Sequence, residues 1–178
     1  AETAYSYFRN CVFGYGQRGR AFMLRLKEGK LEWVWEPVKA GNGLRRVMGW
    51  GVKALTARRF HKEKLLRIFR TMAVVVVTRF DGNGAAAGTK IKIFSIASEG
   101  PGLLHRVELA SVAESNARLF DSRDLSGRVV DVSICGFHGS LRLLFSNRIE
   151  LKVLLPSLLV TKFTKFESRE PGLRGGEF

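Results

Sequence analysis

Lysine and arginine are the residues in this sequence that most clearly suggest a binding chemistry, and they are distributed unevenly. Residues 1–72 contain sixteen Lys or Arg against five Asp or Glu, and residues 73–178 contain fourteen against eleven, so +11 of the net charge of +14 lies in the first two-fifths. A large excess of basic residues attracts polyanions, so nucleic acid is the first partner class to expect and an anionic membrane surface the second. Aromatic residues such as Trp33, Trp35 and Trp50 are interleaved with these charges.

Catalytic and metal-binding patterns are not evident. The three histidines stand apart from any pattern that would define a nucleophile and its base. Asp121, Asp124 and Asp131 could cluster, but a loop of solvated acids is the simpler interpretation, and two-metal chemistry needs grouped carboxylates. Cys11 and Cys135 are the only cysteines and are far apart, which supports neither a zinc site nor a disulfide framework. We therefore expect a non-catalytic protein without a cofactor.

The glycine-rich segment 14–19 has the literal spacing Gly-x-Gly-x-x-Gly. A dinucleotide-binding site needs a helix immediately after this motif, so that the helix N-terminus can hold the pyrophosphate. Residues 20–27 alternate as a strand instead, which favours a hairpin loop. Backbone amides of this loop, together with Arg18 or Arg20, could still contact phosphate.

The first half predicts strands followed by a helix. Thr56 is a plausible N-cap for a basic amphipathic helix that continues to about Thr71. Its basic face would be a solvated surface or a ligand contact. The expected strands before this helix cover residues 5–13, 20–27, 31–38 and 44–53.

The second half predicts the same order of elements. Residues 114–127 are polar enough for a long loop, and leucines at helical spacing predict a helix from 148 to about 165, which Pro156 should kink. No apolar run approaches the roughly 18 residues that span a bilayer, so no membrane partner is expected. The expected strands cover residues 73–80, 89–97, 103–112, 128–135 and 141–145.

This order of strands, helix, strands and helix resembles the Whirly fold. The best local point of the resemblance is residues 140–147 followed by 148–166, which look like the last strand and closing helix of that fold, including a late proline. The resemblance implies an α+β protein of two tandem ββββα units, about 5–72 and 73–166, with antiparallel sheets closed by helices. Residues 1–167 would form one domain, and 168–178 a flexible tail.

Proteins with this fold include plant single-stranded-DNA-binding proteins and kinetoplastid mitochondrial guide-RNA-binding proteins. The resemblance to the mitochondrial type implies a homo- or hetero-oligomer, a tetramer with a related subunit, that binds RNA through phosphates on a sheet face. It further implies a role in mitochondrial RNA editing, by promoting annealing of guide RNA to mRNA. The expected nucleic-acid-binding residues are Arg18, Arg20, Arg25, Lys27, Lys30, Arg45, Arg46, Lys53, Lys90 and Lys92.

Two alternatives remain open. An organellar ribosomal or ribonucleoprotein subunit would also be basic and bound to RNA, but permanently embedded in its assembly. An enzyme acting on nucleic acid would need the carboxylate cluster that the sequence does not display.

The chain begins at Ala1 without Met, which is consistent with loss of a transit peptide or with a truncated product. RNA and single-stranded DNA are equally compatible with the sequence.

Overall fold

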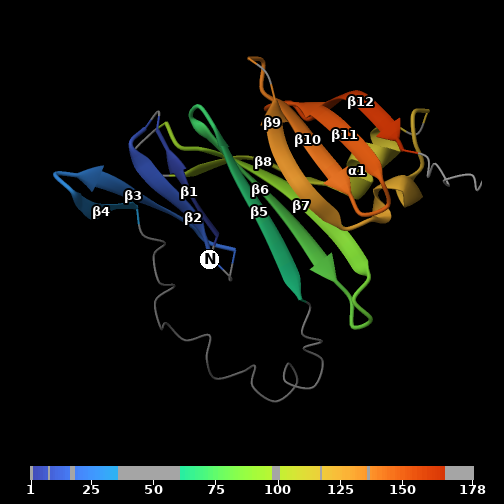
Figure 1. The fold of residues 1–178 in the computed structure, drawn as a ribbon, viewed down its shortest axis with the longest axis horizontal. Coiled ribbons are helices and arrows are strands. Elements are labelled where there is room, and N and C mark those ends of the chain that lie inside the picture. Colours follow the sequence, from blue (N-terminus) through green and yellow to red (C-terminus); the bar gives the residue numbers. More distant parts are fainter. Residues whose placement is uncertain are drawn as a thin grey trace, which may run out of the picture.

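The computed structural model describes residues 2–7, 9–16, 19–35, 61–97, 101–116, 118–135 and 137–166, and it consists largely of three antiparallel sheets (Figure 1). The first sheet contains β1 (Glu2–Ser6), β2 (Cys11–Tyr15), β3 (Ala21–Lys27) and β4 (Lys30–Trp35). The central sheet contains β5 (Lys62–Phe69), β6 (Met72–Phe80), β7 (Ala86–Ser95) and β8 (Gly102–Glu108). The third sheet contains β9 (Val129–Cys135), β10 (Ser140–Phe145), β11 (Ile149–Leu154) and β12 (Leu159–Lys165).

The central sheet is covered on both faces, and β6 shows this most clearly. Successive strand residues point to opposite faces of a sheet. Val74 and Val76 pack into a core shared with the third sheet, whereas Ala73, Val75 and Val77 pack into a core shared with the first sheet. Burial on both faces explains why β6 is continuously apolar rather than alternating.

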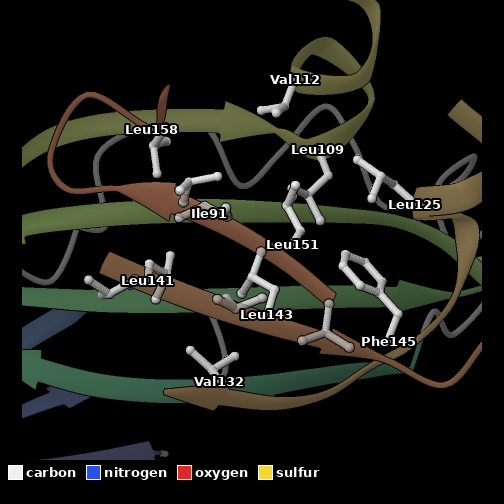
Figure 2. Close-up of a cluster of buried hydrophobic side chains, with 14 of the residues drawn as sticks. Ile91, Leu109, Val112, Leu125, Val132, Leu141, Leu143, Phe145, Leu151 and Leu158 are labelled. Atoms are coloured by element: carbon white, nitrogen blue, oxygen red, sulfur yellow. The ribbon is translucent and has the colours of Figure 1, made fainter. Parts of the chain in front are cut away.

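The core between the central and third sheets is the larger of the two. It is closed at one end by α1 (Leu109–Ser115) and the 3-10 helix η1 (Ser122–Ser126), which contribute Leu109, Val112 and Leu125. Figure 2 shows these side chains converging with those of both sheets. The sheet residues buried there include Ile91, Ile93, Val132, Leu141, Leu143, Phe145, Leu151 and Val153.

The core between the central and first sheets is smaller and more aromatic. Phe13 and Tyr15 come from β2 and Met23 from β3, and all three are at most 2% exposed. The Phe13 and Phe94 rings lie 5.4 Å apart between centroids. This core attaches the first sheet to the central one.

The predicted helix over 56–71 is wrong where the structure describes it. Residues 62–69 form β5, which pairs residue by residue with β6. Leu65 and Phe69 face the third sheet, whereas Leu66 and Ile68 face the first. A strand buried on both faces has apolar residues at adjacent positions, and that pattern is also compatible with a helix. Residues 56–60 lie outside the described part of the chain, as does the predicted strand over 44–53.

The predicted helix over 148–165 is also wrong, because that segment forms the β11–β12 hairpin. Ile149, Leu151 and Val153 are buried at every second position, and Pro156 lies in the turn between the strands. Leu155 and Leu158 lie in the same turn, and they contribute to the misleading helical spacing of leucines. The α+β class holds in the coarse sense of antiparallel sheets with a helix, but three sheets replace the two expected ββββα units.

Two smaller expectations need correction. The predicted strand over 5–13 is divided by a turn into β1 and β2, and the predicted loop over 114–127 contains the end of α1 and all of η1. Asp121 caps η1, since its carboxylate accepts from the Arg123 N–H and the Asp124 carboxylate accepts from the Asp121 N–H. A reciprocal cap of this kind satisfies exposed donors at a helix start. The predicted tail over 168–178 lies outside the described residues.

We expect the Leu143→Ala variant to lose stability because Leu143 is fully buried in the larger core. Removing a buried leucine side chain costs about 2–5 kcal/mol of unfolding free energy. The matched control is Leu104→Ala on β8, where the side chain is 48% exposed, and its expected cost is below about 0.5 kcal/mol. Urea unfolding followed by circular dichroism measures both, and equal losses would contradict the assigned core.

Candidate anion-binding site

Beyond the smaller core, the same face of the central sheet changes from apolar to basic. On β5, Lys62 and Lys64 precede Leu66 on this face, and on β7, Lys92 precedes Phe94. The alternation of strand side chains places these lysines on the side that faces the first sheet. They contribute to a cavity of about 320 Å³, here called the cationic pocket, lined by Tyr15, Gly19, Lys62, Lys64, Val77, Arg79, Lys90, Lys92 and Arg106.

Strand register places like charges opposite one another in the cationic pocket. Lys62 is paired with Arg79 across β5 and β6, and Lys92 with Arg106 across β7 and β8. Directly opposed like charges destabilise a sheet. Lys90 is different, because it lies opposite Glu108 and forms an ion pair with it. The pocket therefore concentrates positive charge at a cost to folding.

Tyr15 positions two of the ammonium groups. Its ring is 2% exposed, and the Nζ atoms of Lys64 and Lys92 lie 5.6 and 5.1 Å from its centroid. Lys92 Nζ donates to the Tyr15 hydroxyl at 2.5 Å, and Lys64 Nζ donates to the Gly16 carbonyl at 2.9 Å. An ammonium group has three donors, so both lysines retain donors for an anion.

Arg79 brings a guanidinium into the same pocket. Its Nε atom is buried and has no hydrogen-bond partner among the described residues. Gly88 lies opposite Arg79 in the register with β7, and a Cβ placed there would be 3.6 Å from Arg79 Nη2. That distance is an ordinary contact, and the φ of +152° at Gly88 is the reason that glycine suits this position. A buried donor without a partner costs folding free energy, typically about 1–3 kcal/mol.

The charge environment is visible in Lys64. Burial lowers its pKa below the ordinary value, and the neighbouring charges of Lys62 and Lys92 lower that pKa further. Glu2 acts in the opposite direction on the pKa without cancelling the effect. A lowered lysine pKa means that the folded site disfavours its own positive charge. A bound anion would relieve this repulsion.

The predicted residues are only partly brought together. Lys90 and Lys92 line the cationic pocket, and Arg20 is exposed next to Gly19 at its rim. Arg25 and Lys27 share the Met23 side of β3, which faces the central sheet rather than outward, and they are exposed past the end of the core. Lys30 is exposed at the start of β4, which belongs to the first sheet, as β3 does. Arg18, Arg45, Arg46 and Lys53 lie outside the described residues.

The described residues of the glycine-rich segment end β2 and lead into β3, and these strands pair antiparallel, as the hairpin interpretation predicts. Its glycines have structural reasons: a Cβ on Gly14 would meet the Phe22 ring at 1.9 Å, and Gly19 has a φ of +76°. The Gly19 N–H donates to the Gly16 carbonyl at 3.0 Å. Of the described residues in this segment, Tyr15 and Gly19 line the cationic pocket.

Four basic pocket residues were missed by the sequence-based choice of site residues: Lys62, Lys64, Arg79 and Arg106. Lys62 and Lys64 fall on the basic face of the helix that the sequence predicts over 56–71, where the structure has β5. Residues 62–69 do not alternate between apolar and polar, so the sequence offers no clear signal for this strand. The positions of Arg79 and Arg106 depend on register, which the sequence does not display.

No protein-family model, curated protein or solved structure matches this chain. Within the described ranges, no group of three or more His, Cys, Asp or Glu residues is arranged to hold a metal ion. The helices among these same residues are too short or too polar to cross a membrane.

We expect Lys64→Met to raise stability at low salt, because it removes one charge from a cluster of like charges. The gain should be about 0.5 kcal/mol, or roughly 1–2 °C in Tm for a chain of this length. Thermal unfolding at low and high salt measures it, and the gain should shrink as salt screens the cluster. The control, Lys165→Met on β12, removes a charge that is paired with Asp124 at 3.4 Å, so it should show no gain. A fall in Tm for Lys64→Met would mean that the contacts with Tyr15 and Gly16 outweigh the repulsion.

Proposed function

We propose that this protein binds single-stranded nucleic acid, RNA in the first instance, through phosphates held in the cationic pocket, and that it does so without catalysis. The observation that carries this proposal is the convergence of six Lys or Arg side chains on one cavity, with two like-charge pairs opposed across strands. Such an arrangement costs stability in the free protein. Bound phosphate would convert that cost into binding free energy.

The dimensions of the pocket favour a chain of phosphates over a single small anion. The cations extend across all four strands, from Lys62 on edge strand β5 to Arg106 on edge strand β8. Three strand spacings of about 4.8 Å give a width of roughly 14 Å. That width exceeds one phosphate group and suits two or three successive phosphates of a flexible strand. Arginine offers paired donors to phosphate oxygens, and lysine offers a mobile point charge.

The resemblance to Whirly-fold proteins does not carry this proposal, since the two ββββα units that it implied are absent from the described residues. The expected mitochondrial location, tetrameric assembly and role in guide-RNA annealing remain predictions. So does the alternative of an organellar ribonucleoprotein subunit. The cationic pocket supports phosphate binding under either biological role.

Salt dependence tests the proposal directly. Binding of a fluorescently labelled oligouridylate to the full chain, followed by anisotropy, should give a linear fall of log affinity with log salt. Each neutralised phosphate contributes a slope of about −0.7 for a single strand, so two or three predict a loss of about tenfold between roughly 50 and 200 mM salt. A flat response would contradict phosphate binding.

The double variant Arg79→Gln/Arg106→Gln tests whether the pocket is the site. It should weaken binding about tenfold at low salt and make the salt slope shallower by about 0.7 for each lost contact. The matched control, Lys27→Gln/Lys162→Gln, loses the same charge from exposed positions that do not line the pocket, so its slope should stay unchanged. Equal effects in the two proteins would show that net charge, rather than the pocket, determines binding.

A further inference from the structure

We propose that a second site, at the far end of β5 from the cationic pocket, stacks a nucleobase of the same bound strand. This site, here called the stacking site, consists of Tyr7, Arg70 and Phe137. The inference rests on the proposed function, because it assigns a base contact to a strand whose phosphates are held elsewhere. It adds a preference for single strands that phosphate contacts alone do not provide.

Turns from all three sheets meet at the stacking site. Tyr7 follows β1, Arg70 lies in the β5–β6 turn, and Phe137 lies in the β9–β10 turn (Figure 1). A cavity of about 470 Å³ is lined there by Tyr5, Ser6, Tyr7, Ile68 and Arg70. Lys62 begins β5 at the cationic pocket, and Arg70 follows its end, so one strand connects the two sites.

Arg70 links the aromatic residues of the site. Its guanidinium carbon lies 5.2 Å from the Phe69 ring centroid and 5.1 Å from the Phe137 ring centroid. Its Nη2 donates to the Phe137 carbonyl at 3.2 Å. On the other side, the Tyr5 and Tyr7 rings meet edge to face, with centroids 4.8 Å apart. The guanidinium plane is thus held among rings while the residue as a whole remains exposed.

The aromatic rings of the site are accessible to a ligand. Phe137 is 82% exposed and Tyr7 is 91% exposed, whereas Phe13 and Phe145 are almost completely buried in the two cores. Rings so exposed contribute little to either core. Phe137 lies beside the Arg70 guanidinium, and Tyr7 lines a cavity together with Arg70. Such a surface suits a flat, electron-rich ring, because bases stack on aromatic and arginine planes in a sequence-tolerant way.

Nucleobases match this surface better than other planar groups because of the neighbouring phosphate site. From Lys62 to Arg70, an extended strand at about 3.3 Å per residue covers roughly 26 Å. A nucleic-acid strand anchored in the cationic pocket can therefore reach the stacking site over several nucleotides. Bases in a duplex are already stacked and paired, so their faces are available only in a single strand.

The decisive experiment compares two oligonucleotides of equal length and backbone, one with bases and one abasic, binding to the full chain. We expect the wild-type protein to bind the base-bearing strand more tightly. Phe137→Ala and Tyr7→Ala should each weaken that binding by about 5- to 100-fold, while affinity for the abasic strand and the salt slope stay unchanged. Quenching of 2-aminopurine in the bound strand should decrease in the same variants.

Two further variants separate stacking from folding. Phe166→Ala is the matched control, since Phe166 is a 46% exposed ring after β12 that belongs to neither site. It should bind as the wild type does. Arg70 has a φ of +52°, a conformation that glycine adopts without strain. Arg70→Gly should therefore keep the fold and its Tm while losing discrimination between base-bearing and abasic strands.

The outcomes distinguish the two proposals. If the wild type binds both strands equally with steep salt dependence, and Phe137→Ala changes nothing, the stacking site is wrong and the phosphate site stands. If the wild type binds neither strand, the proposed function itself fails. Equal affinity for duplex and single strands would also overturn the stacking site, because it offers nothing to paired bases.

Discussion

Burial of the central sheet on both faces is the constraint on which the rest of the structure depends. Val74 and Val76 face one core and Val75 and Val77 face the other, so β6 has no polar face in its middle. A sheet of this kind needs a partner layer on each side, and the first and third sheets fill these places. Charged residues of the central sheet are then restricted to its ends and to the stretches that a neighbouring layer leaves open. The cationic pocket lies where the smaller core ends, and the stacking site lies at the turns beyond the opposite end.

Basic residues on the two faces of the central sheet have different partners. Toward the third sheet, Arg67 pairs with Asp131 at 3.5 Å, and Arg128 reaches back to Glu63 at 2.7 Å, so both ion pairs join the layers. Toward the first sheet, the register opposes lysine and arginine with one another, and Glu108 pairs with Lys90 alone among the pocket cations. If these charges served only to keep the surface soluble, either like-charge or complementary pairing would suffice. Repeated like-charge pairing on one face and complementary pairing on the other indicates that the unbalanced face is suited to an external anion.

Alternation of apolar and polar residues predicted β7 correctly, and a continuous β-branched run predicted β6, whereas β5 was mistaken for a helix. Residues 89–97 were predicted correctly as a strand because Ile91 and Ile93 alternate with Lys90 and Lys92, and the same alternation identified these two lysines as site residues. β5 lacks so clear an alternation, because its adjacent apolar residues serve different layers. β11 does alternate, but the leucines of the turn that follows it extend its apolar positions into a helical spacing. Arg79 and Arg106 could not be assigned from sequence, since only the pairing of β5 with β6 and of β7 with β8 brings them beside the lysines. Register is a property of the folded sheet, and no local pattern encodes it.

β5 holds the cationic pocket and the proposed stacking site at a fixed distance, which affects how the affinities of the two sites would combine. β5 pairs with β6 along its full length, and β1 and β9 lie against it from either side, so the spacing between Lys62 and Arg70 is fixed by backbone hydrogen bonds. Linked contacts add strongly only when one ligand reaches both without strain, since the second contact then forms at a high effective concentration. An oligonucleotide too short to span roughly 26 Å would occupy one site at a time. Under the proposed function, discrimination by length would follow from the geometry of the sheet, without any base-specific hydrogen bond, and it would favour extended single strands over compact anions of equal charge.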